Sequence, residues 1–343
     1  MILYIGNKLS KHGFSQTSVE TLGQQLSEYF CIQTVSDKRN KVIRLADMIL
    51  AVLRSYRKIS KVIIDTYSTS NFYYAFIVSQ LCRLLNIPYI PVLHGGGLPS
   101  RIDRSKKLSE MIFSYSHINV APSGYLNAEF RKRGFGNIII IPNNINIKEY
   151  KYTARVNFSP RLLWVRSFDK IYNCSMAVDV LSQLKKKYKN TRLCMVGPDK
   201  DGSMQKTIEY ARSVGLTVGN EVSSDADLVI TGRLNKPEWH SLAEKYNVFI
   251  NTTNFDNTPV SVIEAMALGM VVVSTNVGGI PYIIDDSIDG FCVEKENSVD
   301  MTAKIIKVIT DSHQSEEIAN NARKKIEDFD WEVVKNKWIE VLK

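Results

Sequence analysis

The sequence predicts an α/β protein with two doubly wound, Rossmann-like domains, each built on a parallel sheet. Two observations lead to this fold class. Short apolar runs alternate with helical stretches twice along the chain, and a segment without periodicity, 142–160, separates the two series. The length of 343 residues allows each domain a core of its own, and the 44% apolar and 23% charged content is typical of a globular protein.

The first domain is expected over residues 1–155. Its predicted strands are short apolar runs that end at polar or turn-forming residues: Ile2–Ile5, Ile32–Val35, Val62–Asp65, Tyr89–Leu93, Ile118–Val120 and Ile138–Ile141. Helical segments lie between them, for example Thr17–Tyr29 and Asn71–Asn86. This alternation predicts parallel strands joined by crossover helices.

The second domain is expected over residues 156–325. Its predicted strands follow the same pattern: Arg161–Val165, Leu193–Val196, Leu228–Thr231, Val248–Ile250, Val271–Ser274 and Phe291–Val293. The last segment, 326–343, is predicted as a separate amphipathic helix, because large apolar side chains recur there at helical spacing: Trp331, Val334, Trp338 and Leu342.

Positive charge is concentrated in the first half of the chain. Residues 1–150 hold 19 lysines and arginines against 9 acidic residues, a net charge of +10, whereas residues 151–343 hold 25 against 26 and carry −1. The excess lies in the runs DKRNKVIR, RSYRKISK, RIDRSKK and RKR. Basic faces attract anionic membranes or nucleic acid, and no nucleic-acid recognition motif is present. We therefore expect peripheral contact with an anionic membrane; the alternative is that these charges are spread around the domain and bind nothing.

The cysteines and the N-terminal stretch bear on the compartment. Five scattered cysteines without a C-x-x-C pair argue for a reducing environment and against structural zinc or a disulfide framework. The stretch MILYIGNKLSKHG has too short an apolar run for a signal peptide and is expected to form the first strand. A cytoplasmic protein at the inner face of a membrane is the resulting expectation.

Ligands of doubly wound domains bind at the carboxyl ends of the strands. The residues after the predicted strands are rich in glycine, amide and cationic side chains, which suits a phosphorylated, hydroxyl-rich ligand. They are Gly6–Gly13, His94–Gly97, Pro142–Asn144, Arg166–Lys170, Gly197, Gly232–Arg233, Asn251–Pro259 and Thr275–Gly279.

The stretch DNTPVSVIEAMALG predicts a helix with a carboxylate on an apolar face. Thr258 is expected to cap this helix, Pro259 to occupy its first turn, and Gly269 to end it. Glu264 falls on the same arc as Ile263 and other apolar residues. An ionised carboxylate there requires a partner, either a bound ligand or a salt bridge inside the core.

The segment from Asp256 to Glu264, continued by AMALGMVVVSTNVGGIP, resembles the E-x7-E segment of glycosyltransferase family 4, whose members are retaining enzymes with the GT-B fold. The resemblance extends over essentially the whole chain and is densest over 227–293. Its other parts are HG at His12–Gly13, HGGG at His94, IPNNI at 141–145, TGRL at Thr231 and the final helix. It implies two domains facing across a cleft, an N-terminal one for the acceptor and a C-terminal one for a nucleotide-sugar, with the final helix crossing back to the first domain.

The resemblance also implies roles for individual residues. Asp256, which stands where the family has Glu, would meet hydroxyls of the donor sugar, and Glu264 would accept hydrogen bonds from the ribose. The helix after Pro259 would direct its N–H groups at the diphosphate. The implied donor-binding set is Gly13, Arg166, Lys170, Gly232, Arg233, Asp256, Asn257, Thr258, Val260, Ser261 and Glu264.

The catalytic residues implied are His94, Arg166 and Asp256. Fixed cations stabilise the negative charge that develops on a departing diphosphate, which is the role implied for Arg166. The family places a Lys five residues after this Arg, where this chain has Ile171, so Lys170 serves only if its loop shifts by one residue. Ordinary surface charges at both positions are the alternative.

His94 would lie against the sugar near the reacting carbon. HGGG also matches the oxyanion motif of lipases, but the G-x-S-x-G elbow of those enzymes is missing from the sequence. A purely structural histidine is the alternative.

The implied activity is retaining transfer of a sugar from a nucleoside diphosphate donor, expected to be a UDP-sugar, to a hydroxyl of a glycan or lipid-linked acceptor in cell-surface polysaccharide or glycolipid synthesis. No cofactor or metal is expected, because Asp225-x-Asp227 precedes its strand and therefore points away from the ligand edge. Two alternatives stay open: a GT-B nucleotide-sugar epimerase, which needs only the donor, and a non-catalytic protein that binds nucleotide-sugars or polyanions.

Overall fold

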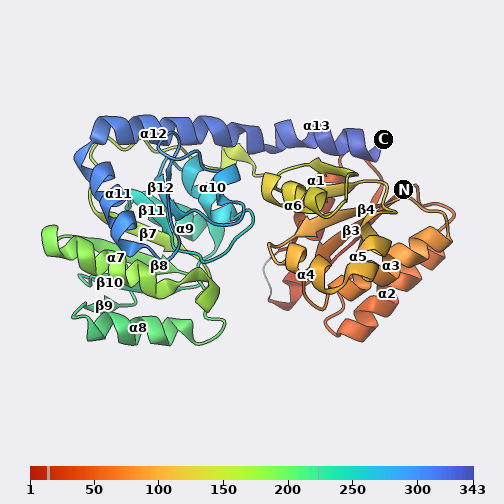
Figure 1. Ribbon diagram of the computed structural model, residues 1–343, viewed down its shortest axis with the longest axis horizontal. Coiled ribbons are helices and arrows are strands. Elements are labelled where there is room, and N and C mark those ends of the chain that lie inside the picture. The colour runs from red at the N-terminus through yellow and green to blue at the C-terminus, as the bar shows by residue number, and fades with distance from the viewer. Residues whose placement is uncertain (14–15, 223) are drawn as a thin grey trace. The chain divides into compact units, whose positions relative to one another are not determined.

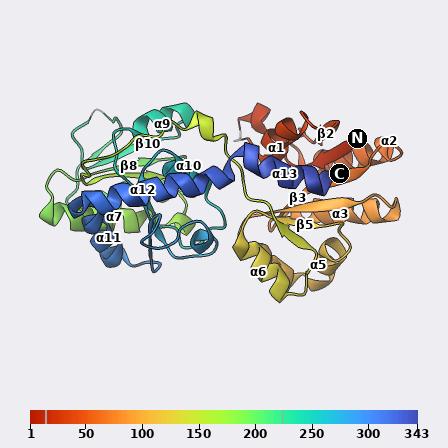
Figure 2. The same cartoon turned by 90° about the horizontal axis from the view of Figure 1, so that it is seen from above.

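The computed structural model describes residues 1–13, 16–222 and 224–343. The chain divides into two compact units (Figures 1 and 2). Unit 1 comprises Met1–Asn143 together with Val334–Lys343, and unit 2 comprises Asn144–Val333. Each unit contains one parallel sheet with helices packed on it, so the predicted α/β class with two Rossmann-like domains is confirmed.

Unit 1 has a six-stranded sheet in the order β2-β1-β3-β4-β5-β6. The strands are β1 (Ile2–Ile5), β2 (Ile32–Val35), β3 (Lys61–Tyr67), β4 (Tyr89–His94), β5 (Asn119–Ala121) and β6 (Ile138–Ile140). The helices are α1 (Ser18–Leu26), α2 (Lys41–Ser55), α3 (Phe72–Leu84), α4 (Leu98–Arg104), α5 (Lys106–Phe113) and α6 (Gly124–Lys132). All six predicted strands form, and β3 extends two residues beyond its predicted end. The order reverses between β1 and β3, the kind of position where doubly wound sheets bind ligands.

Unit 2 has a seven-stranded sheet in the order β13-β12-β11-β7-β8-β10-β9. The strands are β7 (Arg161–Val165), β8 (Arg192–Val196), β9 (Val218–Gly219), β10 (Leu228–Gly232), β11 (Val248–Asn251), β12 (Val271–Thr275) and β13 (Phe291–Val293). The helices are α7 (Cys174–Lys187), α8 (Ser203–Ser213), α9 (Lys236–Ala243), α10 (Val260–Ala267), α11 (Ser298–Thr310) and α12 (Ser312–Ile326). Among the described strands of unit 2, β9, two residues at the sheet edge, is the one that was not predicted.

Side chains that alternate along the strands of unit 2 build two cores, one on each face of the sheet. Leu162 and Trp164 of β7 join a cluster with the buried residues of α7 and α11, whereas Leu163 joins the cluster of α9 and α10. The order reverses between β7 and β11, which are direct neighbours.

The predicted boundary at residue 155 differs from the division in the structure, because the segment that follows Asn143 is tied to unit 2. Ile145 donates its N–H to Phe329 O, 3.0 Å away, and the N–H of Trp331 donates to Ile145 O at 2.8 Å. Arg155 is buried, and its guanidinium donates to backbone carbonyls that include Tyr246 O at 2.9 Å. Burial lowers the pKa of Arg155 to about 10, so the side chain is still cationic at neutral pH.

The C-terminal segment also differs from the predicted domain ends. Unit 2 continues past residue 325 to Val333, and the final helix, α13 (Trp331–Leu342), contributes its residues from Val334 onward to unit 1. Within unit 1 the backbone oxygen of Val341 accepts a hydrogen bond of 3.0 Å from Lys61 Nζ. No helix in the described part of the chain has the length and low polarity that crossing a bilayer requires.

The start of α10 corrects one prediction. The helix begins at Val260, and Pro259 is its N-cap with extended backbone (ψ 110°), so neither Thr258 nor Pro259 takes the predicted position. Val260 is partly exposed, whereas residues 262–267 are buried all round the helix, so Glu264 lies in a buried helix and not on one apolar face. Gly269 follows the helix with φ +79°, a left-handed conformation that glycine adopts readily.

Candidate active site

Most of the predicted site residues lie at one edge of the sheet in unit 2. Arg166 follows β7, and Asp256 belongs to the loop after β11, at the point where the strand order reverses. The other predicted donor-binding residues of this unit end a strand, follow one or lie in α10: Lys170, Gly232, Arg233, Asn257, Thr258, Val260, Ser261 and Glu264. Gly13 and His94 belong to unit 1.

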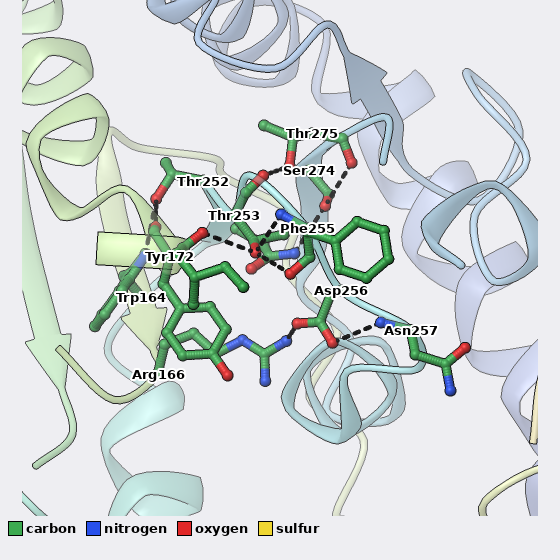
Figure 3. A network of polar contacts seen from close by, with 12 residues as sticks. Trp164, Arg166, Tyr172, Thr252, Thr253, Phe255, Asp256, Asn257, Ser274 and Thr275 are labelled. Atoms are coloured by element: carbon green, nitrogen blue, oxygen red, sulfur yellow. Dashed lines mark hydrogen bonds and ion pairs between the residues drawn. The ribbon is translucent and has the colours of Figure 1, made fainter. Parts of the chain in front are cut away.

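Arg166 and Asp256 form an ion pair (Figure 3). Both side chains are largely buried, with exposed fractions of 15% and 16%. The guanidinium carbon of Arg166 lies 4.8 Å from the centre of the Tyr172 ring, and Asp256 Oδ1 accepts a hydrogen bond of 2.9 Å from the N–H of Asn257. Burial lowers the pKa of Arg166 to about 10, which leaves it cationic at neutral pH. The cation expected at the phosphates and the carboxylate expected at the sugar are therefore direct neighbours.

The loop after β11 is held by hydroxyl groups (Figure 3). Trp164 Nε1 donates to Thr252 Oγ1 at 3.1 Å, and the Thr252 hydroxyl donates to Tyr172 O at 2.9 Å. The hydroxyl of Thr275 at the end of β12 donates to Thr253 O at 2.6 Å. These hydrogen bonds anchor the loop to β7 through Trp164 and to β12 through Thr275, and they thereby help to position the Asp256 carboxylate.

Two glycines after β12 allow the backbone of this loop to pack closely. A Cβ atom on Gly278, which has φ +55°, would lie 2.0 Å from Asp256 O, and one on Gly279 would lie 1.7 Å from Asn257 O. The N–H of Gly279 donates to Asp256 O at 3.0 Å. Glycine is therefore required at both positions for the loop to keep this place.

A third glycine performs the same function beside Arg166. A Cβ on Gly197, which follows β8, would lie 1.7 Å from Arg166 O. The N–H of Arg166 donates to Val196 O at 3.0 Å, and the N–H of Gly197 donates to Gly232 O at 2.8 Å. The ends of β7, β8 and β10 are thus joined into one backbone platform.

Glu264 is buried and already has two partners. Its Oε1 accepts a hydrogen bond of 2.8 Å from the Tyr150 hydroxyl and lies 2.8 Å from Lys236 Nζ. Burial, with the Glu264 charge as the second cause, raises the pKa of Tyr150 well above its usual range. The salt bridge joins a buried carboxylate to a lysine whose side chain is 60% exposed, so the pair lies at the edge of the core and not inside it.

The remaining predicted donor-binding residues vary in exposure. The Lys170 side chain is exposed, and its backbone N–H donates to Asp201 Oδ2 at 3.1 Å. Gly232 ends β10 with φ +71°, and Arg233 is exposed. Asn257 and Thr258 are buried next to the start of α10, and Ser261 is half-buried in its first turn.

His94, at the end of β4 in unit 1, is held by a carboxylate that the sequence analysis did not single out. Its Nε2 lies 2.7 Å from Oδ1 of the fully buried Asp65, to which the Tyr4 hydroxyl also donates at 2.9 Å. The Nε2 side of the imidazole therefore faces this carboxylate. The ring of Tyr67 stacks on the imidazole at 4.8 Å, and a Cβ on Gly6 would lie 2.4 Å from Asp65 Oδ2.

Replacing Asp65 with asparagine is expected to lower kcat by about tenfold to a hundredfold, the range of one hydrogen bond to a charged group. The amide keeps the shape of the carboxylate but replaces one of its oxygen atoms with an NH2 group, which changes the hydrogen bond that holds the imidazole of His94. The measurement is kcat against pH, with Asp103→Asn as the control, because Asp103 is a half-exposed aspartate of unit 1 paired with Arg133. Equal profiles for both variants and the native protein would show that Asp65 does not act through His94.

The Asp225-x-Asp227 pair has local cationic partners. Arg192 pairs with both carboxylates, at 2.8 Å and 3.3 Å, and Lys185 also pairs with Asp227. The pair precedes β10, as the sequence analysis expected. In the described residues, no group of three or more His, Cys, Asp or Glu side chains is placed to hold a metal ion.

Comparison with known proteins agrees with this architecture. An uncharacterised glycosyltransferase of Methanocaldococcus jannaschii is 25% identical over 80% of this chain and 75% of its own length. The GalNAc-α-(1→4)-GalNAc-α-(1→3)-diNAcBac-PP-undecaprenol α-1,4-N-acetyl-D-galactosaminyltransferase of Campylobacter jejuni is 23% identical over 53% of this chain and 47% of its own length. The crystal structure of Anabaena HepE in complex with UDP superposes with a TM-score of 0.80 over 99% of both chains at 14% identity, which shows the shared fold.

A family model also matches the sequence directly. The match covers residues 153–325, just over half of the chain and nearly all of unit 2. It includes the ion pair of Arg166 and Asp256, the glycines after β12 and the whole of α10. The chain belongs to the family of glycosyl transferases group 1.

Proposed function

We propose that this protein is a retaining glycosyltransferase of family 4 that transfers a sugar from a UDP-sugar to a hydroxyl acceptor. The observation that carries the proposal is the neighbouring Arg166 and Asp256 at the strand-order reversal of unit 2, beside the N-terminus of α10. A buried cation and a helix N-terminus suit a diphosphate. The UDP bound to HepE, which has the same fold, supports the choice of nucleotide.

In the proposed reaction Arg166 stabilises the UDP leaving group as the bond between the sugar and the diphosphate breaks. A preorganised cation is effective here because it already lies where negative charge develops. Asp256 contacts sugar hydroxyls, the first turn of α10 contacts phosphate oxygens, and Glu264 accepts hydrogen bonds from the ribose. The acceptor hydroxyl attacks from the face that the diphosphate leaves, and a leaving phosphate oxygen takes its proton, so the configuration is retained.

The proposed acceptor is a glycan or a lipid-linked hydroxyl at an anionic membrane surface. Two observations support it: the excess of basic residues in the first half of the chain, and the Campylobacter relative, whose name specifies an undecaprenol diphosphate-linked acceptor. The proposed place of action is the cytoplasmic side of the membrane, in synthesis of a surface polysaccharide or glycolipid.

A donor panel tests the proposal. Purified protein is incubated with UDP-, GDP- and ADP-linked sugars, with and without lipid extract, and products are separated by mass. Transfer of sugar to lipid or glycan from a UDP donor is the expected result. A changed free nucleotide-sugar would identify an epimerase, and binding without chemistry would identify a non-catalytic protein.

Activity is expected to persist in excess EDTA. Arg166 and the N-terminus of α10 are proposed to neutralise the diphosphate, and Asp225 and Asp227 are engaged with Arg192 and Lys185. The initial rate should change less than twofold (about 0.4 kcal/mol) between protein treated with EDTA and the same sample restored with Mg²⁺. Loss of activity that Mg²⁺ restores would reopen a metal role for the two aspartates.

A further inference from the structure

Helix α2 of unit 1 carries apolar side chains on its solvent-facing side. Val42 is 75% exposed, Ile43 57%, Leu50 43% and Leu53 44%, and Ala46 lies between them on the same face. The opposite face is buried through residues that include Met48, Ala51 and Val52. A surface helix ordinarily turns polar residues outward, as α1 of the same unit does with Thr21 and Gln24, so α2 differs from α1.

The five apolar residues form one continuous stripe, which we call the α2 stripe: Val42, Ile43, Ala46, Leu50 and Leu53. Their spacing of three, four and seven positions places them on one side of the helix over about 17 Å of its length. The helix is firmly built, because the Asn40 side chain accepts hydrogen bonds from the N–H groups of Val42 at 2.9 Å and Ile43 at 3.2 Å.

Cations lie at both ends of the α2 stripe. The exposed basic residues are Lys38, Arg39 and Lys41 before or at its start and Arg54, Arg57 and Lys58 at or beyond its end. The acidic groups nearby are already paired: Asp37 lies 3.3 Å from Lys38, and Asp47 accepts a hydrogen bond from Ser36. Two of the four basic runs in the sequence are thus the two ends of this helix.

The buried Arg44 keeps the first group of cations in place. Its guanidinium donates to Lys38 O at 3.1 Å and to Arg39 O at 3.4 Å from the inner side of the helix. At the other end the Arg57 guanidinium donates to the Tyr56 hydroxyl at 2.8 Å, and Tyr56 is itself 41% exposed. An apolar stripe between cations, with an aromatic ring at one end, has the composition of helices that lie in a lipid–water interface.

We propose that the α2 stripe is the surface by which this protein docks on an anionic lipid bilayer, with its apolar side chains among the acyl chains and the flanking cations at lipid phosphates. Charge decides between the possible occupants. A second copy of the stripe would bring cations against cations, whereas an anionic surface complements them. The biological purpose of this docking rests on the proposed function, since docking would bring unit 1 to a lipid-linked acceptor. The docking surface itself can be tested without measuring any reaction.

Vesicle co-sedimentation with paired variants tests this surface. The native protein should pellet with phosphatidylglycerol–phosphatidylcholine vesicles at low salt and be released by about 0.5 M salt, where the screening length falls to a few ångströms. Leu50→Gln combined with Leu53→Gln should weaken vesicle binding by about tenfold or more, because two leucine side chains no longer insert among the acyl chains of the bilayer. Arg54→Gln combined with Arg57→Gln should weaken binding to these vesicles and leave binding to pure phosphatidylcholine unchanged.

Matched controls come from unit 2. Val299 and Ile288 are exposed apolar residues there, 69% and 58%, and Lys186 and Lys206 are exposed cations. Val299→Gln with Ile288→Gln, and Lys186→Gln with Lys206→Gln, should bind vesicles like the native protein. Melting temperatures should change little in any variant, because every altered side chain is exposed.

The outcomes are distinct. If the leucine variant binds as well as the native protein, or if the controls lose as much, the α2 stripe is not the docking surface. A leucine variant that changes only the oligomeric state identifies a second copy as the occupant and overturns the proposal. Donor hydrolysis without vesicles is measured in parallel and should be equal in all variants. If the donor panel shows no sugar transfer while vesicle binding follows the expectation, the proposed function fails and the docking surface stands.

Discussion

Arg166→Ala is expected to lower kcat by about a hundredfold or more, the effect of losing one charge-stabilising group at a transition state. The guanidinium is buried, remains cationic at neutral pH, and lies at the end of β7 where the sheet order reverses. In the proposed function this guanidinium, which Asp256 already holds in place, meets the diphosphate. The measurement is steady-state kinetics with the best UDP-sugar, with KM reported separately from kcat.

The alternative role of Arg166 is structural, because its removal leaves the Asp256 carboxylate without its cationic partner. Asp256→Asn separates the two roles, since it breaks the ion pair but keeps the cation. If the pair matters only for folding, Arg166→Ala and Asp256→Asn should lower the melting temperature together while kcat per folded molecule is unchanged. If Arg166 acts on the leaving group, the arginine variant loses kcat at a temperature where it is fully folded.

Two further variants calibrate this result. Arg161→Ala is the matched control, because Arg161 begins the same strand at the opposite edge of the sheet and is exposed. Lys170→Ala should have a smaller effect than Arg166→Ala, since Lys170 is exposed and stands one position before the family's lysine. If all three variants keep the native kcat, Arg166 and Lys170 both lie outside the site.

The fold was predictable because apolar runs and helical periods are local properties of the sequence. Each β-strand of unit 1 coincides with a predicted short run, and an inner strand such as Ile2–Ile5 is buried on both faces, whereas the edge strand Ile32–Val35 is partly exposed. Strand β9 escaped prediction because two residues at an edge carry no period. The predicted start of α10 was one residue too early. Thr258 is a good N-cap and Pro259 suits a first turn, but the helix begins at Val260 with Pro259 as its N-cap, and sequence rules do not separate such adjacent starts.

The site was predictable only in part, because its pairings join distant segments. Arg166 and Asp256 could each be selected from the residues after strands, but their ion pair depends on β7 and β11 being neighbours. Tyr150 lies in a segment without periodicity and reaches Glu264 across 114 positions of sequence. Asp65 ends an apolar run and resembles an ordinary strand terminus, so only the three-dimensional arrangement shows that it holds His94.

Glu264→Ala is expected to weaken UDP binding by about tenfold to a hundredfold, the range for losing hydrogen bonds between a charged group and ribose hydroxyls. Transfer activity should fall with it, and the protein should stay folded. Isothermal calorimetry with UDP gives the affinity, and thermal unfolding gives the stability of the same samples. Glu264→Gln is the companion variant, because it keeps the side-chain volume inside the buried helix.

The contacts of Glu264 with Tyr150 and Lys236 make a structural role the direct competitor. Tyr150→Phe is the control for that role, since it removes a hydrogen bond from the carboxylate and leaves its charge in place. It should cost about 1 kcal/mol of stability and change the UDP affinity little. An unchanged UDP affinity in Glu264→Ala, with only a lower melting temperature, would mean that the contacts with Tyr150 and Lys236 are the whole function of this carboxylate. A loss of affinity in Glu264→Ala that is absent from Tyr150→Phe would instead assign Glu264 to the ribose, because both variants lose the hydrogen bond between Tyr150 and Glu264 but only Glu264→Ala loses the carboxylate.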